Sequence, residues 1–507
     1  MPKVVFIMTD TQRYDMVNAN VQTGLKTPCL DKLAASGMRF TQAYTTQPVC
    51  QPARAAIFTG LYPHSCNSWT NSMALSEDVH TIGQRLRDNN IHTAYIGKWH
   101  LDGGDYFGWG KCPDGWDGEY WYDMRNYLEE LTEEERRMSR NTNSMKTHDY
   151  SPEFTYAHRC SNRAIEFLKK NGQKQDFFLT VSYDEPHGPY LCPREYWEQY
   201  ENYEFPQSPN IKDTLEGKPD YQKVWAGPRL QQDRNDIHLN NKYFFGCNSF
   251  VDMEIGRVLD AIKEYAGEDV TVIYTSDHGD MLQSHCMYAK GPACYEEICH
   301  IPLFMAGKGI AAGSVSSQPV SHINLTPTIL DIFGVKPSPM MPGKSILPQA
   351  KGECDRINDY CFIEFGRYEV DHDGFGGYQP MRAVFDGRYK LSINLMSTDE
   401  LYDLQADPHE MKNLIDSPQH YEIACRLHKE ILNNMNVTRD PFRGYYWERR
   451  SWRKDAAQAT WDYTGYTRQS EDDYRPRQLD YATGMEMEQA TRTKERLKEE
   501  QEIAKKK

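Results

Sequence analysis

The sequence predicts an α/β protein in which a large, mostly parallel sheet is sandwiched by helices and is followed by a small antiparallel sheet with one packed helix. Three observations indicate this fold class. Short apolar runs alternate with helical patterns over the first two-thirds of the 507 residues. Polar residues follow the ends of two of these runs. After about residue 374, a hairpin pattern replaces the alternation.

The strands of the large sheet are expected at short apolar runs, the pattern of strands that are buried on both faces. These runs are residues 4–8, 93–96, 177–182 and 270–275. Helical patterns lie between them, at residues 28–37, with Gly37 as the terminating residue, and at residues 244–265. Because such alternation requires crossover connections, we expect parallel strands with helices on both faces.

The C-terminal third has a different pattern. Residues 381–385 and 389–395 flank Asp386-Gly387, a strong hairpin signal, and a helix is expected at residues 419–434. The sequence therefore predicts a catalytic domain at residues 1–370, an α+β subdomain at 371–440, and an extension rich in aromatic and charged residues at 441–507. The charge-dense end of this extension is interpreted as a solvated helix, with a subunit contact in a homo-oligomer as the alternative.

Composition excludes several classes of function. The net charge is −15, from 58 basic and 73 acidic residues, which argues against a general nucleic-acid binder. No apolar run approaches the roughly 18 residues of a membrane span, so no membrane insertion is expected. Residues 4–8 run straight into Thr9-Asp10 without the pattern of a secretion signal, so a cytoplasmic location is expected. The 13 cysteines lack paired or zinc-site spacing and fit a reducing compartment.

Acidic residues follow two of the predicted strands. Asp10 comes directly after the first strand, and Asp277 and His278 follow the strand at residues 270–275. The carboxyl ends of parallel strands meet at one edge of the sheet, where gathered carboxylates repel each other unless a cation is present. For one aspartate alone, a helix cap or turn would be the better interpretation. For the set, the sequence favours a hard divalent metal ion.

Cys50 is expected at the beginning of a helix. Pro52 is typical of a first helical turn, and Gly60 is typical of the residue that follows a helix. A helix N-terminus favours negative charge, and Arg54 lies one turn further along the same face. These surroundings suit a thiol nucleophile with a low pKa. A buried structural cysteine explains the same pattern equally well, so the residues alone leave both interpretations open.

The segment Cys50-Gln51-Pro52-Ala53-Arg54 and its continuation to residue 60 resemble the signature of the formylglycine-dependent sulfatases, members of the alkaline phosphatase superfamily. Further blocks resemble that family in the same order along the chain. They lie at residues 97–101, 185–189, 276–280, 290–297 and 400–414. The resemblance extends over roughly residues 3–440, and six ordered blocks make chance a poor explanation.

The resemblance implies an alkaline-phosphatase-like fold and the conversion of Cys50 to formylglycine by a maturation enzyme. It implies a bound Ca²⁺, with Mg²⁺ or Mn²⁺ as alternatives, held by the modified Cys50 together with three side chains: Asp10, Asp277 and His278. It also implies that Arg54, Lys98 and Lys290 stabilise charge on the sulfuryl oxygens.

Proton transfer is assigned by the same resemblance. His187 or Lys290 is expected to protonate the departing alcohol, and His100 to take the proton from the second hydroxyl of the formylglycine hydrate. Taken singly, each of these lysines and histidines would be a surface or structural residue. Their places within the matched blocks favour the catalytic interpretation.

The chain departs from the family pattern at three places. Ala53 stands where many members have serine, and Thr11 follows Asp10 where many members have a second acidic residue. His278 stands where several sulfatases have asparagine; it resembles other sulfatase branches and also the phosphonate monoester and phosphodiester hydrolases of the same fold.

The resulting prediction is a sulfuric ester hydrolase that acts on a small sulfated sugar or on an aryl or alkyl sulfate. A phosphonate monoester or phosphodiester hydrolase is the alternative. A catalytically silent, anion-binding member is disfavoured because every block is present.

The pocket for the leaving group is predicted from weaker signals. Arg367 and His372 lie in a polar segment at the junction of the predicted domains, where ligand pockets often form. Trp69 and Asn71 are candidates of the same kind. A hydrogen-bonded interdomain loop would explain the polar segment equally well. A cytoplasmic location would favour small imported substrates over intact polymers.

Overall fold

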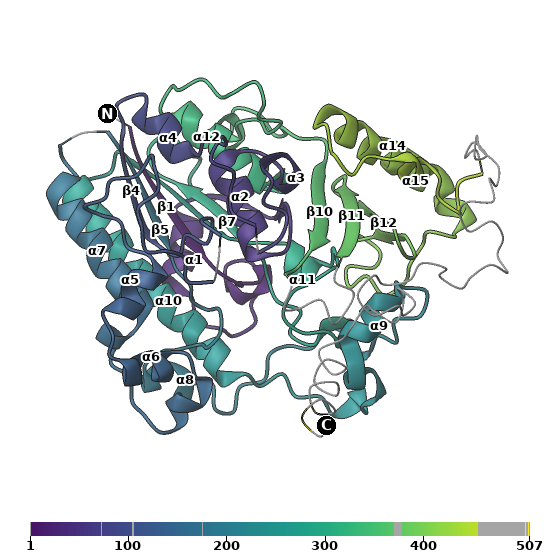
Figure 1. The fold of residues 1–507 in the computed structure, drawn as a ribbon, viewed down its shortest axis with the longest axis horizontal. Helices are drawn as coiled ribbons and strands as arrows, with labels where there is room; N and C mark the ends of the chain where they lie inside the picture. Colours follow the sequence, from purple (N-terminus) through teal and green to yellow (C-terminus); the bar gives the residue numbers. More distant parts are fainter. Residues whose placement is uncertain are drawn as a thin grey trace.

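The computed structural model describes residues 2–71, 73–103, 106–174, 176–369, 378–454, 502 and 505. Its main sheet has seven strands in the order β4-β5-β1-β6-β7-β2-β8 (Figure 1). Their bounds are β1 Lys3–Thr9, β2 Gly37–Phe40, β4 His92–Gly97, β5 Phe177–Ser182, β6 Val270–Ser276, β7 Leu303–Ala306 and β8 Ser314–Ser316. Every neighbouring pair is parallel except those of β7, which runs antiparallel to β6 and β2. The predicted mostly parallel sheet is confirmed.

Helices cover both faces of this sheet because its central strands are apolar on both sides. On β1, Val5 and Ile7 contact the core under three helices: α1 Pro28–Ala35, α7 Tyr156–Asn171 and α10 Lys242–Ala261. Val4 and Phe6 point to the other face. That face packs against α2 Cys50–Thr59, α4 Ile82–Arg87 and α12 Leu325–Ile332. The central strands therefore lie between two hydrophobic layers.

Gly37 has a different role from the one expected. Helix α1 ends at Ala35, and Gly37 is the first residue of β2. A Cβ atom at Gly37 would lie 2.0 Å from the carbonyl oxygen of Met305 on β7. The glycine is therefore needed for close approach of two strand backbones, not to terminate the helix.

The second sheet is antiparallel, with the order β10-β11-β12-β13. Its strands are β10 Cys361–Arg367, β11 Tyr378–Phe385, β12 Tyr389–Asn394 and β13 Glu400–Asp403. Helix α14, Tyr421–Val437, packs Leu427 and Ile431 against one face of it. The predicted hairpin at Asp386-Gly387 and the packed helix are confirmed, while the proposed division into domains stays a prediction.

The remaining elements are short. Two strands, β3 Ala43–Tyr44 and β9 Val320–Ser321, form a separate pair. The short helices are α3 Pro63–Cys66, α5 Met124–Glu129, α6 Glu133–Ser139, α8 Arg194–Glu198, α9 Asp220–Ala226, α11 Glu296–Cys299, α13 Leu347–Ala350 and α15 Tyr445–Glu448. Among the described residues, no helix is both long enough and apolar enough to cross a membrane.

Candidate active site

The carboxyl ends of four neighbouring strands deliver polar side chains to one place. Thr9 and Ser276 are paired in the register of β1 and β6, so Asp10 and Asp277 leave the sheet side by side. Gly97 and Ser182 are paired in the same way on β4 and β5, and Lys98 follows directly. This is the edge at which α/β sheets bind ligands.

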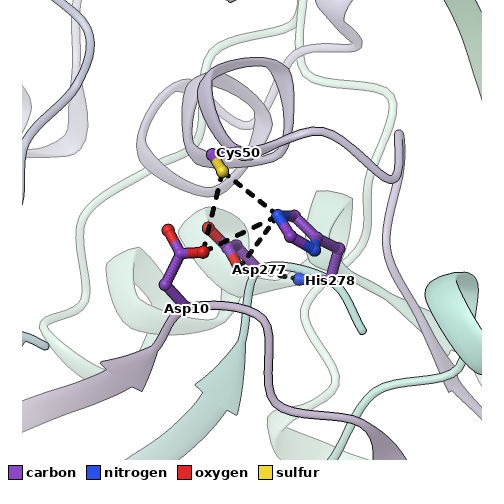
Figure 2. Close-up of side chains that lie close together, drawn as sticks. All are labelled: Asp10, Cys50, Asp277 and His278. Carbon is purple, nitrogen blue, oxygen red and sulfur yellow. Dashed lines mark hydrogen bonds and ion pairs between the residues drawn. The ribbon is translucent and has the colours of Figure 1, made fainter. Parts of the chain in front are cut away.

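Cys50 is the first residue of helix α2 and is fully buried. Its Sγ atom lies 3.2 Å from Nε2 of His278 and 3.6 Å from Oδ1 of Asp10. Figure 2 shows the three side chains turned toward one another. The backbone of Gly60 is left-handed at the other end of the helix, with φ of 70°, as its glycine predicted. Helix α2 therefore presents Cys50, with its N-terminal amide groups, to the strand ends.

Three cationic side chains surround these groups. Arg54 donates to Oδ2 of Asp277 at 3.2 Å and to Oδ2 of Asp10 at 3.1 Å. Lys98 Nζ donates to the same Asp10 oxygen at 2.7 Å. Lys290 Nζ lies 2.8 Å from Sγ of Cys50. All three cations are buried, so their charges act without screening by solvent.

The electrostatics of the site follow from this arrangement. Burial and the Asp10 carboxylate act to raise the pKa of the Cys50 thiol, but Lys290 and Lys98, together with a hydrogen bond from His187, lower it, and the net effect is a lowered pKa. Burial, followed by the negative charge of Asp10, raises the pKa of Asp277 to about 7. The site therefore favours an anion at Cys50. The carboxylates of Asp10 and Asp277 repel each other, so a positive charge between them would be favourable.

The donor atoms at this place fit a divalent metal ion. Asp10, Cys50, Asp277 and His278 each offer one atom, and these atoms all lie within 4.8 Å of one another. His278 Nδ1 faces the carbonyl oxygen of Gly279 at 2.8 Å, which leaves Nε2 directed at the carboxylates (Figure 2). A second nitrogen fixed by a carbonyl is typical of a metal-binding histidine. Two carboxylates and an imidazole are a suitable donor set for such an ion.

Both predicted catalytic histidines lie at this site. His187 Nε2 is 3.3 Å from Lys290 Nζ. His100 is buried, and its Nδ1 has no hydrogen-bond partner in the described part of the chain. Burial, and then the charge of Lys98, lower the pKa of His100 well below its ordinary value. His100 is therefore neutral at physiological pH and has a lone pair available to accept a proton.

The predicted substrate-pocket residues are placed differently from one another. Asn71 lies next to the site, because its Oδ1 accepts the backbone N–H of Gln51 at 3.0 Å. Trp69 makes T-shaped ring contacts with Tyr378 and Phe442. Arg367 ends strand β10. His372 lies outside the described residues.

Two residues of the site were missed by sequence reasoning. Asp184 accepts a hydrogen bond from Lys98 Nζ at 3.0 Å. It follows the predicted strand at residues 177–182 by two positions, so the strand-end rule that identified Asp10 could have found it. Tyr106 donates to Asp184 and covers Lys98, whose Nζ lies 3.8 Å from its ring centre. Tyr106 lies in an aperiodic loop, and its position carries no sequence signal.

Comparison with known proteins gives consistent results. A family model described as Sulfatase matches residues 2–335, and a model described as N-sulphoglucosamine sulphohydrolase, C-terminal, matches residues 284–437. The Uncharacterized sulfatase YidJ of Escherichia coli (strain K12) is 41% identical over 491 residues, which cover 96% of this chain and 97% of that protein.

Solved structures share the fold. The structure of BT4656 in complex with its substrate D-glucosamine-2-N,6-O-disulfate has a TM-score of 0.71 at 20% identity, covering 87% of this chain and 99% of that one. The phosphonate monoester hydrolase SpPMH from Silicibacter pomeroyi has a TM-score of 0.72 at 22% identity, covering 87% and 96%. At these identities, the two likenesses concern the fold alone.

Proposed function

Because the chain belongs to the sulfatase family and is a sulfuric ester hydrolase, we propose that its substrate is a small sulfated sugar or an aryl or alkyl sulfate. The observation that carries this proposal is the position of Cys50. Its Sγ lies between a metal-binding donor set and the Lys290 amine, at the N-terminus of a helix. A group that is attacked from Cys50 would therefore lie in a buried environment beside the Lys290 amine and the proposed metal ion, as an anionic ester requires.

We propose that Cys50 is converted to formylglycine by a maturation enzyme. The hydrated aldehyde would supply a hydroxyl nucleophile at the position of the thiol. The pull of Lys290 and Lys98 toward an anion at Cys50 supports this role, because the same charges favour loss of a proton from a hydroxyl placed there.

We propose that Asp10, Asp277, His278 and the modified Cys50 hold a Ca²⁺ ion, with Mg²⁺ or Mn²⁺ as alternatives. Such an ion would polarise the sulfuryl oxygens and lower the pKa of the nucleophilic hydroxyl. The donor atoms within 4.8 Å of one another support this assignment.

The three cationic side chains are proposed to have different roles at the site. Lys290 faces Cys50 directly and is proposed to contact the sulfuryl group. The hydrogen bonds of Arg54 go to the two carboxylates, so we propose that Arg54 acts mainly by orienting Asp10 and Asp277. Lys98 bridges Asp10 and Asp184 and adds positive charge at the same place.

Proton transfers are proposed for the two histidines. His187, beside Lys290, would give a proton to the alcohol oxygen when the ester's sulfur–oxygen bond breaks. His100 would take the proton whose loss allows sulfate to leave Cys50. The unpartnered Nδ1 of His100 supports its role as a base, and its lowered pKa means that the ring is neutral before the transfer.

The decisive experiment compares sulfate and phosphate esters of the same alcohols. The protein is co-expressed with a formylglycine-generating enzyme, and sulfate release from sugar, aryl and alkyl sulfates is measured by ion chromatography, with Cys50→Ala as the control variant. We expect the wild-type protein to release sulfate and the Cys50→Ala variant to release none. In the wild-type protein, the peptide that contains residue 50 should differ in mass from the unmodified peptide. Hydrolysis of phosphodiesters without any sulfate release would overturn the proposal.

Phosphonate monoester or phosphodiester hydrolysis is the second candidate. His278 favours it, because this residue resembles that branch of the superfamily, and SpPMH has the same fold. The complex of BT4656 with a sulfated glucosamine supports the sulfated sugar instead. The cytoplasmic location and the homo-oligomer stay predictions, to be checked by cell fractionation and by light scattering.

A further inference from the structure

Tyr106 is the best-connected side chain at the site that the proposed function leaves without a role. Its hydroxyl group contacts Asp184 Oδ1 and lies 3.0 Å from Nδ1 of His187. Its ring lies under Lys98 and against His100, with ring centres 5.3 Å apart in the second case. One tyrosine therefore contacts three of the proposed catalytic residues.

The hydrogen-bond directions at Tyr106 can be assigned from chemistry. A phenol has one proton, and the carboxylate of Asp184 is the stronger acceptor, so the hydroxyl donates to Asp184. The phenol oxygen then accepts from Nδ1 of His187. The carbonyl oxygen of Gly188, 2.9 Å from the same Nδ1, is an acceptor only. Both contacts therefore require a proton on Nδ1.

This assignment also determines what the second ring nitrogen of His187, Nε2, faces. With Nδ1 held between Tyr106 and Gly188, Nε2 faces Lys290 Nζ at 3.3 Å, and that amine lies 2.8 Å from Cys50 Sγ. When the sulfur–oxygen bond of the ester breaks, the alcohol oxygen keeps the bonding electron pair and needs one proton. With its proton on Nδ1, the neutral ring has only a lone pair at Nε2, so the proton has to come from the Lys290 ammonium, which donates to Nε2.

We propose that Tyr106, held by Asp184, is a positioning residue that orients His187 so that Nε2 takes a proton from the Lys290 ammonium and passes it to the leaving alcohol, which leaves Lys290 as the neutral amine. The proposal rests on the proposed function, because it assumes that His187 serves the leaving group. It goes beyond that function by assigning protonation of the leaving group to a chain of contacts, Asp184–Tyr106–His187, that starts on a different strand end from the metal-binding donors.

The test uses Tyr106→Phe, which removes the hydroxyl and keeps the ring on Lys98 and His100. A series of substituted phenyl sulfates varies the acidity of the leaving phenol. We expect kcat for the poorest leaving groups to fall by about 10- to 100-fold, and kcat for 4-nitrophenyl sulfate by less than about threefold, because a good leaving group needs little help from an acid. KM is expected to change little.

Two controls separate positioning from folding. Tyr203→Phe removes a tyrosine hydroxyl that donates to the Thr23 carbonyl away from the site, and it should show no dependence on the leaving group. In a His187→Gln background, Tyr106→Phe should change kcat by less than about twofold, because the two residues act on the same step. Thermal unfolding midpoints are measured for every variant.

Equal slowing of all esters by Tyr106→Phe, or losses that multiply in the double variant, would overturn the inference while leaving the proposed function intact. A wild-type protein that releases no sulfate from any ester would instead count against the proposed function.

Discussion

Arg54 makes more buried hydrogen bonds at the site than the sequence pattern indicates. Besides the two carboxylates, its Nη1 donates to the carbonyl oxygen of Lys98 and to the hydroxyl of Ser182, each at 2.7 Å. Arginine suits this position because its planar guanidinium carries several donors in a fixed geometry, whereas lysine offers a single point charge.

Replacing Arg54 tests how far the stability of the protein depends on this buried charge. Arg54→Leu would leave Asp10 and Asp277 buried with less compensation, and we expect a loss of about 3–5 kcal/mol in the free energy of unfolding. Arg87→Leu is the matched control, since Arg87 and Asp114 form an exposed ion pair that is expected to contribute less than about 1 kcal/mol. Urea denaturation of the two variants provides the measurement, and equal losses would contradict the prediction.

Individual residues were predictable where a local rule applied to them. Asp10, Asp277 and His278 follow predicted strands, and Cys50 begins a helix marked by Pro52 and Gly60, so each position followed from its immediate neighbours. The partner of Tyr106, by contrast, lies 78 positions away, and only the folded chain brings the two together. Contacts of this kind depend on tertiary packing, which no local pattern encodes.

At the scale of the element, strand β4 and the residue that follows it depend on one glycine. Gly97 has a φ of 116°, and a Cβ atom there would lie 1.9 Å from the carbonyl oxygen of Ser182 on β5. The next residue is Lys98, whose backbone N–H donates to that same carbonyl at 2.8 Å. The end of this strand therefore sets the position of an active-site cation.

Gly97→Ala should consequently damage activity as well as stability. The added methyl group has to separate β4 from β5, which moves Lys98 away from Asp10, and we expect kcat/KM to fall by about 100-fold or more. Gly118→Ala is the control, because nothing lies within 4 Å of a Cβ at that position. Full activity of Gly97→Ala at a temperature where it is folded would show that Lys98 does not need this register.

Helix α14 contributes a buried histidine that responds to pH. His428 Nε2 donates to the carbonyl oxygen of Trp447 at 2.6 Å, and Nδ1 accepts from Arg453, so the ring is neutral. Burial lowers the pKa of His428 to about 4. The unfolded chain binds this proton below about pH 6.5, whereas the native protein does not, so stability falls as the pH drops from 6.5 toward 4.

His428→Gln removes this titration and keeps a donor for Trp447. We expect the free energy of unfolding to fall less steeply between pH 6.5 and 4 in the variant than in the wild-type protein, by about 3 kcal/mol over the whole interval. Urea titrations at several pH values measure the difference. Parallel curves for the two proteins would show that His428 does not titrate differently on folding.

In the main sheet, the longer strands were the ones that could be predicted. The four strands predicted for the large sheet correspond to β1, β4, β5 and β6, each of six or seven residues. Strands β2, β7 and β8 have only three or four residues, too few to establish a period. The antiparallel strand β7 was therefore not foreseen, and it is the sheet, through pairing with β6, that determines its direction.

For the molecule as a whole, the predicted fold class is confirmed by both sheets and by the similar folds of solved structures. The sequence did not reveal how closely the two sheets are joined. One hydrophobic cluster contains Tyr44 and Val49 from the main part of the molecule together with Phe365 and Met381 from the small sheet. Figure 1 shows β10 beside helix α11, which follows the Lys290 segment.

Lys390 links the small sheet to that segment. It lies buried on β12, and its Nζ contacts Glu296 at 2.7 Å and Glu410 at 2.8 Å. Glu296 begins helix α11, six positions after Lys290, and also accepts a hydrogen bond from Tyr44. Burial acts to raise the pKa of Glu296, but Lys390 and His300 together outweigh it, and the pKa is lowered to about 2.

Lys390→Met should therefore reduce both stability and catalysis. The buried Glu410 and the partly buried Glu296 would lose their shared cation, at a cost of about 3–5 kcal/mol, whereas Arg388→Met, which breaks a half-exposed pair with Asp403, should cost far less. Because Glu296 anchors the segment that carries Lys290, kcat should fall even at temperatures where Lys390→Met is fully folded. An unchanged kcat would mean that the small sheet stabilises the molecule without setting the position of Lys290.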